Sequence, residues 1–452
     1  MVNIRLQQIM NTEQSFGGIG ILFVGDFNQL GPVGKISLPK DIVRWELSKR
    51  NNNGKCLSPT SRYYVDKLSY QGCMLFSKCF RYHLDTQQRS CQNEDNKAHN
   101  DFVRNLAKGD VITAVNLSIY RNLSHVDMSK NKDWHFAPIL VGTNRERSNI
   151  ELQQSILFAN KSKTYVFCWR RYEKNWKNRP THDNEHMELM DPCLWQYFVP
   201  GANAFLTYNV NPSVGLANGS PVICHSMNFR NYTSIQNIEN CIEENNNLPY
   251  GTILQLSKPP SSLNFVVIPT LTGKSMSKFR QEQMNVLQMN SIFGAKSSEI
   301  VVPIALTEMD DDGGDQWNAP IFVKTGNPLN PFASVELRSP FPFDLGFSMT
   351  IHKAQGRTIP RVILSLGKHP TYQQDYASIF VAFSRVRHLD HIRLLEYRPS
   401  GLERNATYLH EYYKHLEKLK RDEDITRYYN GFKDQTGEWK AEFCPTRNKL
   451  NL

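Results

Sequence analysis

A basic, glycine-containing loop between two apolar segments constrains the fold of this chain more than any other stretch. Residues 350–358 read Thr-Ile-His-Lys-Ala-Gln-Gly-Arg-Thr, the apolar run 362–366 follows them, and a second apolar segment ends at residues 384–387 as Ser-Arg-Val-Arg. Buried segments on both sides hold such a loop rigid, so that its backbone N–H groups, amide and cations can surround an anion. The pattern predicts a phosphate-handling loop. On composition alone, a surface loop in which Lys353 and Arg357 are simply solvated is an equal alternative.

A second ligand-facing loop is predicted near the other end of the sequence. A continuous apolar run at residues 19–24 leads into Gly25-Asp26, and Gln29 follows. Such a run is typical of a buried parallel strand, and open α/β sheets bind their ligands at the carboxyl ends of these strands. We therefore expect Asp26 and Gln29 to face a ligand.

Another buried strand is predicted at residues 137–141. It runs into the polar residues Thr143 and Asn144, and the apolar spacing beyond them predicts a helix that extends through Leu157. Short β-like runs follow between residues 252 and 337, and Asn218-Gly219 before them is a strong signal for a hairpin turn. This spacing suits a small β-barrel.

In chain order, residues 16–33, 350–358 and 381–387 resemble motifs III, V and VI of superfamily 1 helicases, and most closely the PIF-type (petite integration frequency) 5′→3′ DNA helicases. The resemblance extends from about residue 1 to residue 397, with poorly matching inserts. It implies an α/β, RecA-like P-loop NTPase helicase fold with a small SH3-like β-barrel insertion. The implied parts are an incomplete first RecA-like domain (1–135), a second RecA-like domain (136–200 and 344–400), the barrel insertion (201–343) and a basic helical tail (401–452).

The resemblance also implies roles for individual residues. Asp26 and Gln29 would sense the γ-phosphate and its water, and Arg385 would be an arginine finger. The remaining candidates are, for the nucleotide, Gly25, Arg89, Gln355 and Gly356, and, for the DNA, Thr143, Asn144, His352 and Lys353. Two alternatives stay open: Arg89 as an exposed helical arginine, and Thr143 with Asn144 as a plain helix N-terminus.

The family uses ATP and Mg²⁺, and its phosphate-cradling loop has the pattern Gly-x-x-x-x-Gly-Lys-Ser/Thr. The sequence contains no such pattern: Ile268 and Gln29 stand where the two nearest candidates would need their first glycine. We therefore expect no metal ligands in this chain, and no ATP hydrolysis at a helicase-like rate by this chain alone. Two classes of function remain. One is an ATP-dependent DNA helicase of repair, recombination or telomere maintenance, whose N-terminal third lies outside this sequence, and the other is an inactive DNA-binding or partner-binding remnant.

The net charge and the cysteine pattern indicate which kind of partner the chain binds and in which cellular compartment it is found. Lys plus Arg exceed Asp plus Glu by 53 to 43, which gives a net charge of +10 and favours a polyanionic partner, here single-stranded DNA. Nine cysteines without a Cys-x-x-Cys pair indicate neither a zinc ribbon nor a disulfide framework, and no apolar run is long enough for a membrane span. A nuclear or other intracellular protein is expected.

Two basic segments carry weaker predictions. Aromatic and basic residues alternate at 169–179, which suits base stacking, although a solvent-facing insert explains them as well. Apolar residues between 402 and 419 recur at helical spacing and predict one long amphipathic helix. That helix either packs on the second domain or presents its basic face to nucleic acid or a partner.

Overall fold

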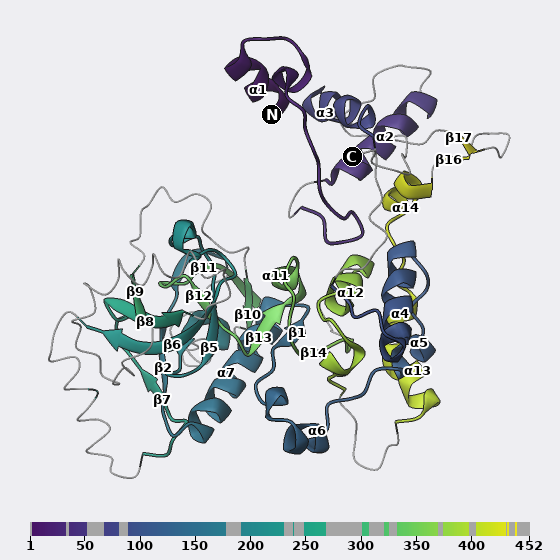
Figure 1. Cartoon of the computed structure of the whole chain (residues 1–452). Coiled ribbons are helices and arrows are strands. Elements are labelled where there is room, and N and C mark those ends of the chain that lie inside the picture. Colours follow the sequence, from purple (N-terminus) through teal and green to yellow (C-terminus); the bar gives the residue numbers. More distant parts are fainter. Residues whose placement is uncertain are drawn as a thin grey trace. The chain divides into compact units, whose positions relative to one another are not determined.

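The computed structural model divides the chain into two compact units, which are described separately (Figure 1). The split unit consists of Met1–Leu123 and Ile351–Leu452, and the middle unit consists of Ser124–Thr350. The structure describes residues 2–32, 36–51, 67–80, 89–177, 191–229, 238, 248–267, 301–306, 321–324, 332–368, 374–396, 404–430, 432–433 and 439–440. Outside this range lie the whole candidate phosphate loop that begins at Ile268, residues 33–35 of the one that begins at Gln29, and residues 178–179 of the aromatic and basic segment.

The middle unit begins with a parallel strand pair followed by a helix, as the sequence predicts. β1 (Ile139–Val141) is buried throughout and pairs in parallel with β13 (Ser348–Thr350). Thr143 then caps α7 (Asn144–Lys161), because its hydroxyl oxygen accepts a hydrogen bond of 3.1 Å from the backbone N–H of Glu146. Two shorter helical elements precede β1, α6 (His125–Lys130) and η3 (Lys132–Trp134).

The rest of the middle unit is mostly β-structure. A five-stranded antiparallel sheet has the order β12 (Phe343–Leu345), β5 (Asn203–Leu206), β6 (Pro221–Asn228), β8 (Ser262–Val267), β9 (Val301–Ala305). Two three-stranded sheets have the orders β10 (Ile321–Lys324), β11 (Phe332–Arg338), β3 (Tyr172–Lys177) and β4 (Trp195–Phe198), β2 (Val166–Arg170), β7 (Ile253–Gln255). The short elements η5 (Pro192–Leu194) and η6 (Pro212–Val214) lie in the connections.

Each of the predicted β-like runs contains a strand, and the predicted turn is confirmed. The backbone N–H of Ser220 donates to the carbonyl of Ala217 at 2.9 Å, which closes a turn around Asn218-Gly219 directly before β6. Gly219 has φ +93°, a conformation that glycine adopts without a steric penalty.

The split unit is mainly helical. Its first part contains α1 (Val2–Met10), η1 (Ser15–Gly18), α2 (Leu38–Asn51), α3 (Lys67–Ser77), η2 (Glu94–Asn96), α4 (Lys97–Lys108) and α5 (Ala114–Ser118). Its second part contains α11 (Ile351–Ala354), α12 (Tyr376–Phe383), η7 (Leu389–His391), α13 (Ala406–Glu417), α14 (Glu423–Asn430) and the short pair β16 (Phe432–Lys433) and β17 (Trp439–Lys440). Between them, β14 (Val362–Leu364) pairs in parallel with β15 (Ile392–Leu394), and both strands are fully buried. Parallel pairs and helices in both units make the chain a mixed α/β protein.

The buried strand predicted at residues 19–24 is wrong. These residues form no strand, and Leu22 and Val24 are 82% and 83% exposed. A continuous apolar run indicates a strand only if neighbouring strands bury both of its faces, and none of the described strands pairs with this run.

The helix predicted from the apolar spacing between residues 402 and 419 is confirmed as α13, and a second helix, α14, follows it. α13 ends at Glu417, and Asp422 starts α14 by accepting hydrogen bonds from the backbone N–H groups of Asp424 (2.9 Å) and Ile425 (3.3 Å). An aspartate that caps a new helix interrupts the periodic pattern without changing the apolar spacing on either side. α13 is anchored at the buried Glu396, which accepts from Arg404 at 2.9 Å and from the Tyr413 hydroxyl at 2.8 Å.

Among the described residues, no helix combines the length and apolar character that a membrane crossing requires.

Candidate functional site

The loop after residue 25 is a compact turn in contact with the basic loop at 350–358. A carboxylate oxygen of Asp26 accepts from the backbone N–H of Asn28 at 2.9 Å, and its other oxygen lies 3.5 Å from the side-chain nitrogen of Gln29. Gln355 then donates its amide N–H to the carbonyl of Leu30 at 3.2 Å. Leu30 and Gln355 are 325 positions apart in the sequence. Their hydrogen bond shows that the two predicted site loops lie side by side in the split unit.

Arg89 links the basic loop to the end of α12. Its Nε donates to the hydroxyl of Thr358 at 2.9 Å, and its Nη1 donates to the carbonyl of Ser384 at 2.8 Å. Partial burial lowers the pKa of Arg89, because the guanidinium gives up hydration. Arg89 is thus fixed in place by two segments from the other end of the sequence.

Arg385 is completely buried and held by its own surroundings. Its Nε donates to the carbonyl of Val381 at 2.9 Å and its Nη2 to the hydroxyl of Ser384 at 2.6 Å. The third bond, from Nη1 to the carbonyl of Arg357, is long at 3.5 Å. Nη1 is therefore the nitrogen that loses least if it turns to another acceptor.

The electrostatics around Arg385 favour an additional anion. Burial is the main reason that its pKa falls to about 10, the positive charge of Arg89 lowers it further, and the carboxylate of Asp26 opposes both effects. Two guanidinium groups thus act with one carboxylate, which leaves an excess of positive charge. A phosphate beside them would stabilise the charged form of both arginines.

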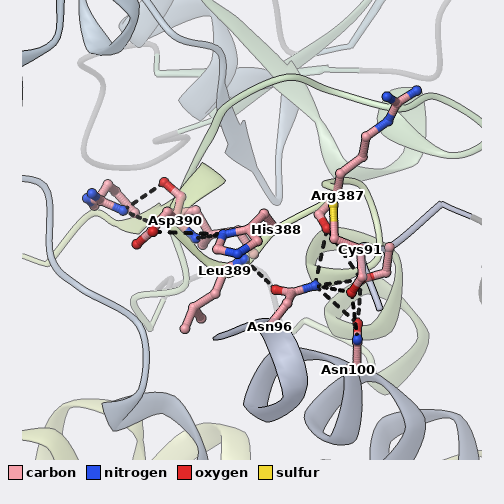
Figure 2. A network of polar contacts seen from close by, with 10 residues as sticks. Cys91, Asn96, Asn100, Arg387, His388, Leu389 and Asp390 are labelled. Carbon is pink, nitrogen blue, oxygen red and sulfur yellow. Dashed lines mark hydrogen bonds and ion pairs between the residues drawn. The ribbon is translucent and has the colours of Figure 1, made fainter. Parts of the chain in front are cut away.

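A buried asparagine network joins the segment that follows Arg89 to the segment that follows Arg385 (Figure 2). The side-chain nitrogen of Asn96 donates to Ser90 Oγ (2.9 Å) and to the carbonyls of Cys91 (3.0 Å) and Arg387 (3.2 Å), while its oxygen accepts from the backbone N–H of Leu389 (2.8 Å). The backbone N–H of Cys91 also donates to the Arg387 carbonyl at 2.9 Å.

Asn100 extends this network by donating to the Cys91 carbonyl at 2.9 Å and by a short hydrogen bond with Ser90 Oγ. Sequence reasoning missed both asparagines. Asn96, Asn100 and Val103 are buried and recur at helical spacing. Two asparagines at positions that the spacing assigns to the apolar face of a helix were the signal in the sequence that could have identified them.

The other predicted site residues lie at loop and helix ends. Gly25 precedes Asp26 directly and has open space around it, and Gly356 has φ +79°, which favours glycine. His352 and Lys353 are exposed on α11. In the middle unit, Thr143 is the N-cap of α7 and Asn144 is its exposed first residue.

The cluster in the split unit suits an anion better than a metal ion. It offers two guanidinium groups and side-chain amides, and no group of three or more His, Cys, Asp or Glu residues in the described part of the chain is placed to hold a metal. The arrangement can hold phosphate oxygens with fixed donors, which is the electrostatic contribution that phosphoryl transfer requires.

Comparisons with known proteins point to one family of enzymes. No protein-family model matches the chain. A stretch of 75 residues is 37% identical to the human ATP-dependent DNA helicase PIF1, and it covers 17% of this chain and 11% of the human protein.

Solved structures similar to the chain include a Pif1 helicase from Candida albicans, with a TM-score of 0.42, 14% identity, and coverage of 95% of this chain and 72% of that one. A Bacteroides Pif1 helicase in complex with ADP-AlF3 and single-stranded DNA gives a TM-score of 0.40, 14% identity, and coverage of 91% and 71%. The match to the human enzyme confirms that the chain resembles the PIF-type helicases.

Proposed function

We propose that the chain functions in ATP-dependent 5′→3′ DNA unwinding of the PIF-helicase type, in which it supplies the part of the nucleotide site that faces the γ-phosphate. The observation that carries this proposal is the convergence of Asp26, Gln355, Arg89 and Arg385 in one cluster. These residues come from four separate stretches of sequence. A structural salt bridge would need only two of them, whereas a phosphate needs several donors around it.

The chemistry of the cluster follows from its charges. Arg385 would exchange its long bond to the Arg357 carbonyl for a γ-phosphate oxygen and stabilise the charge that develops there. Asp26 and Gln29 would orient the attacking water, and Gly25, Gln355 and Gly356 would line the nucleotide.

Single-stranded DNA is the proposed substrate. The net charge of +10 favours a polyanion, and a Bacteroides Pif1 helicase has been solved bound to single-stranded DNA. His352, Lys353, Thr143 and Asn144 are the proposed contacts, and the five-stranded antiparallel sheet is the proposed SH3-like β-barrel insertion. A nuclear role in repair or recombination follows from the same resemblance.

A second candidate function is an inactive DNA-binding or partner-binding remnant. The burial of Arg385 favours it, because all three guanidinium nitrogens already donate to protein atoms. A buried arginine of this kind can serve the fold without any contact to a nucleotide.

Nucleotide binding by the purified chain separates the two candidates, since ATP hydrolysis at a helicase-like rate is not expected of this chain alone. A chain that supplies the γ-phosphate side of the site should bind a fluorescent non-hydrolysable ATP analogue more tightly than the ADP analogue. Arg385→Ala should remove most of that preference, because it removes a charge-assisted contact to the γ-phosphate. DNA binding without nucleotide binding would instead establish the remnant.

A further inference from the structure

The tail beyond residue 400, which the helicase resemblance does not cover, packs against the Asp26–Gln29 loop. Tyr428 of α14 is buried in a cluster with Ile42, Val43 and Cys73, and Phe27 packs against this cluster. The rings of Phe27 and Tyr428 meet edge to face, with centroids 5.5 Å apart and an angle of 84°. Phe27 is the neighbour of Asp26, so the tail supports one side of the candidate site.

Arg421 contacts the same loop from the segment before α14. Its Nη1 donates to the carbonyl of Ala107 at 2.9 Å and lies 3.5 Å from Oδ1 of Asn28. Its Nε donates to the hydroxyl of Thr426 at 3.1 Å, and its guanidinium lies over the Tyr429 ring, 5.6 Å from the centroid. One side chain thus joins the end of α4, the loop and α14.

The fold makes room for this arginine. Gly109, at the end of α4, has φ +92°, and a Cβ atom there would lie 3.0 Å from Nε of Arg421. Any other residue at position 109 would meet both a strained backbone and the guanidinium. The close approach therefore depends on a glycine that also ends α4.

Two ion pairs tie the start of α14 to α2. Lys40 lies 2.7 Å from Asp422, and Arg44 lies 3.6 Å from Asp424. Partial burial acts to raise the pKa of Asp422, but the hydrogen bond and charge of Lys40 bring it below its usual value. The tail is thus attached to α2 by two ion pairs, and it contacts residues 27 and 28 through Tyr428 and Arg421.

We propose that Arg421 and Tyr428 form a tail clamp that positions Asp26 and Gln29 for the γ-phosphate. The inference rests on the proposed function and adds to it that the tail controls the discrimination between ATP and ADP. Arg421 and Tyr428 are positioning residues, because they act through Asn28 and Phe27 and not on the nucleotide.

Hydrogen–deuterium exchange tests the clamp without any nucleotide. Arg421→Ala and Tyr428→Ala should each raise amide exchange at residues 26–30 about tenfold. Arg427→Ala is the matched control, since Arg427 lies on α14 with Tyr428 and, among the described residues, forms its ion pairs with Glu423 and Asp424 of that helix. Arg421→Lys keeps the charge but loses the forked hydrogen-bond donor of the guanidinium group, and it replaces the alanine variants if these do not fold. It should raise amide exchange at residues 26–30 by a smaller factor. Unchanged exchange at 26–30 in folded Arg421 variants would overturn the clamp.

The second measurement compares fluorescent analogues of ADP and of non-hydrolysable ATP. Arg421→Ala should reduce the preference for the ATP analogue roughly fivefold to tenfold, whereas a purely structural role would weaken both nucleotides equally. Arg427→Ala should leave the preference unchanged. If the unmodified chain binds neither nucleotide, the proposed function is contradicted. The clamp is not, because the exchange measurement tests it independently. Equal loss of both affinities would overturn the positioning role.

Discussion

Asn96 has a larger structural role than its place in a polar stretch suggests. It is fully buried, its side-chain nitrogen donates to Ser90, Cys91 and Arg387, and its oxygen accepts from Leu389, so it joins two segments that are far apart in the sequence. Its contacts hold Ser90 and Arg387, which adjoin Arg89 and nearly adjoin Arg385. The candidate site therefore depends on a residue that touches neither guanidinium group.

We predict that Asn96→Ala lowers the free energy of unfolding by about 2–4 kcal/mol, because it leaves the Leu389 N–H and other buried polar groups unpaired. Denaturant unfolding measures this. Asn93→Ala is the control, since Asn93 is exposed and makes no side-chain cap hydrogen bond. Equal stability of the two variants would contradict the structural role of the network.

His99 makes the split unit sensitive to acid. Its Nδ1 lies 2.9 Å from the hydroxyl of Tyr120, and burial, helped by the positive charge of His388 and His391, lowers its pKa to about 4. The unfolded chain therefore binds a proton between about pH 6.5 and pH 4 that the folded chain does not bind.

Stability should be constant above pH 7 and should fall as the pH drops from about 6.5 to about 4, by roughly 3 kcal/mol for this one group. Unfolding curves at several pH values measure the slope. His99→Gln should flatten it, whereas His410→Ala, at an exposed position on α13, should not. A slope that survives His99→Gln would assign the acid sensitivity to other groups.

At the residue scale, the sequence predicted which loops meet but not how their side chains are held. Asp26, Gln355 and Arg385 were identified because they follow apolar runs in a motif order. The burial of Arg385 and its bonds to Val381 and Ser384 depend on the local turn after α12, which no spacing rule describes.

At the scale of elements, long or fully buried segments were predictable and isolated runs were not. β1, α7 and β14 formed where periodicity and apolar character agreed. Residues 19–24 have the same apolar character, but a strand also needs partners, and sequence periodicity carries no information about them. The break between α13 and α14 likewise comes from one cap at Asp422, which leaves the apolar spacing intact.

We expect Asp422→Ala to destabilise the chain by about 1 kcal/mol, chiefly through the lost cap of α14. Asp422→Asn keeps an oxygen that can accept from Asp424 and Ile425 while it removes the charge that pairs with Lys40. Because the pair is partly exposed, the asparagine variant should lose only a few tenths of a kcal/mol. Denaturant unfolding compares the two variants, and similar losses in both would mean that the ion pair, not the cap, holds α14.

At the scale of the whole molecule, the family resemblance was inferred from the order of the motifs, and single-stranded DNA was inferred as the partner from the net positive charge. The small β-barrel stays a prediction, because closure of a barrel depends on register and strand tilt and not on the number of strands. The excess of positive charge is independent of those details, so it supports a prediction about binding.

Affinity for single-stranded DNA should depend weakly on sequence and fall steeply with salt, because each phosphate neutralised by a cation releases condensed counterions. Titration of labelled oligonucleotides at several salt concentrations gives the slope. Lys353→Ala should weaken binding at low salt and reduce the magnitude of the slope by about 0.7, the value for one phosphate contact on a single strand.

Lys420→Ala is the matched control, because it removes the same charge from an exposed position in the tail. If Lys353 contacts a phosphate, its removal changes the slope while removal of Lys420 does not, although both lower the net charge by one. Equal effects of the two variants would mean that the affinity for single-stranded DNA depends on the net charge of the chain and not on a contact with α11. The assignment of His352 and Lys353 as DNA contacts would then be wrong.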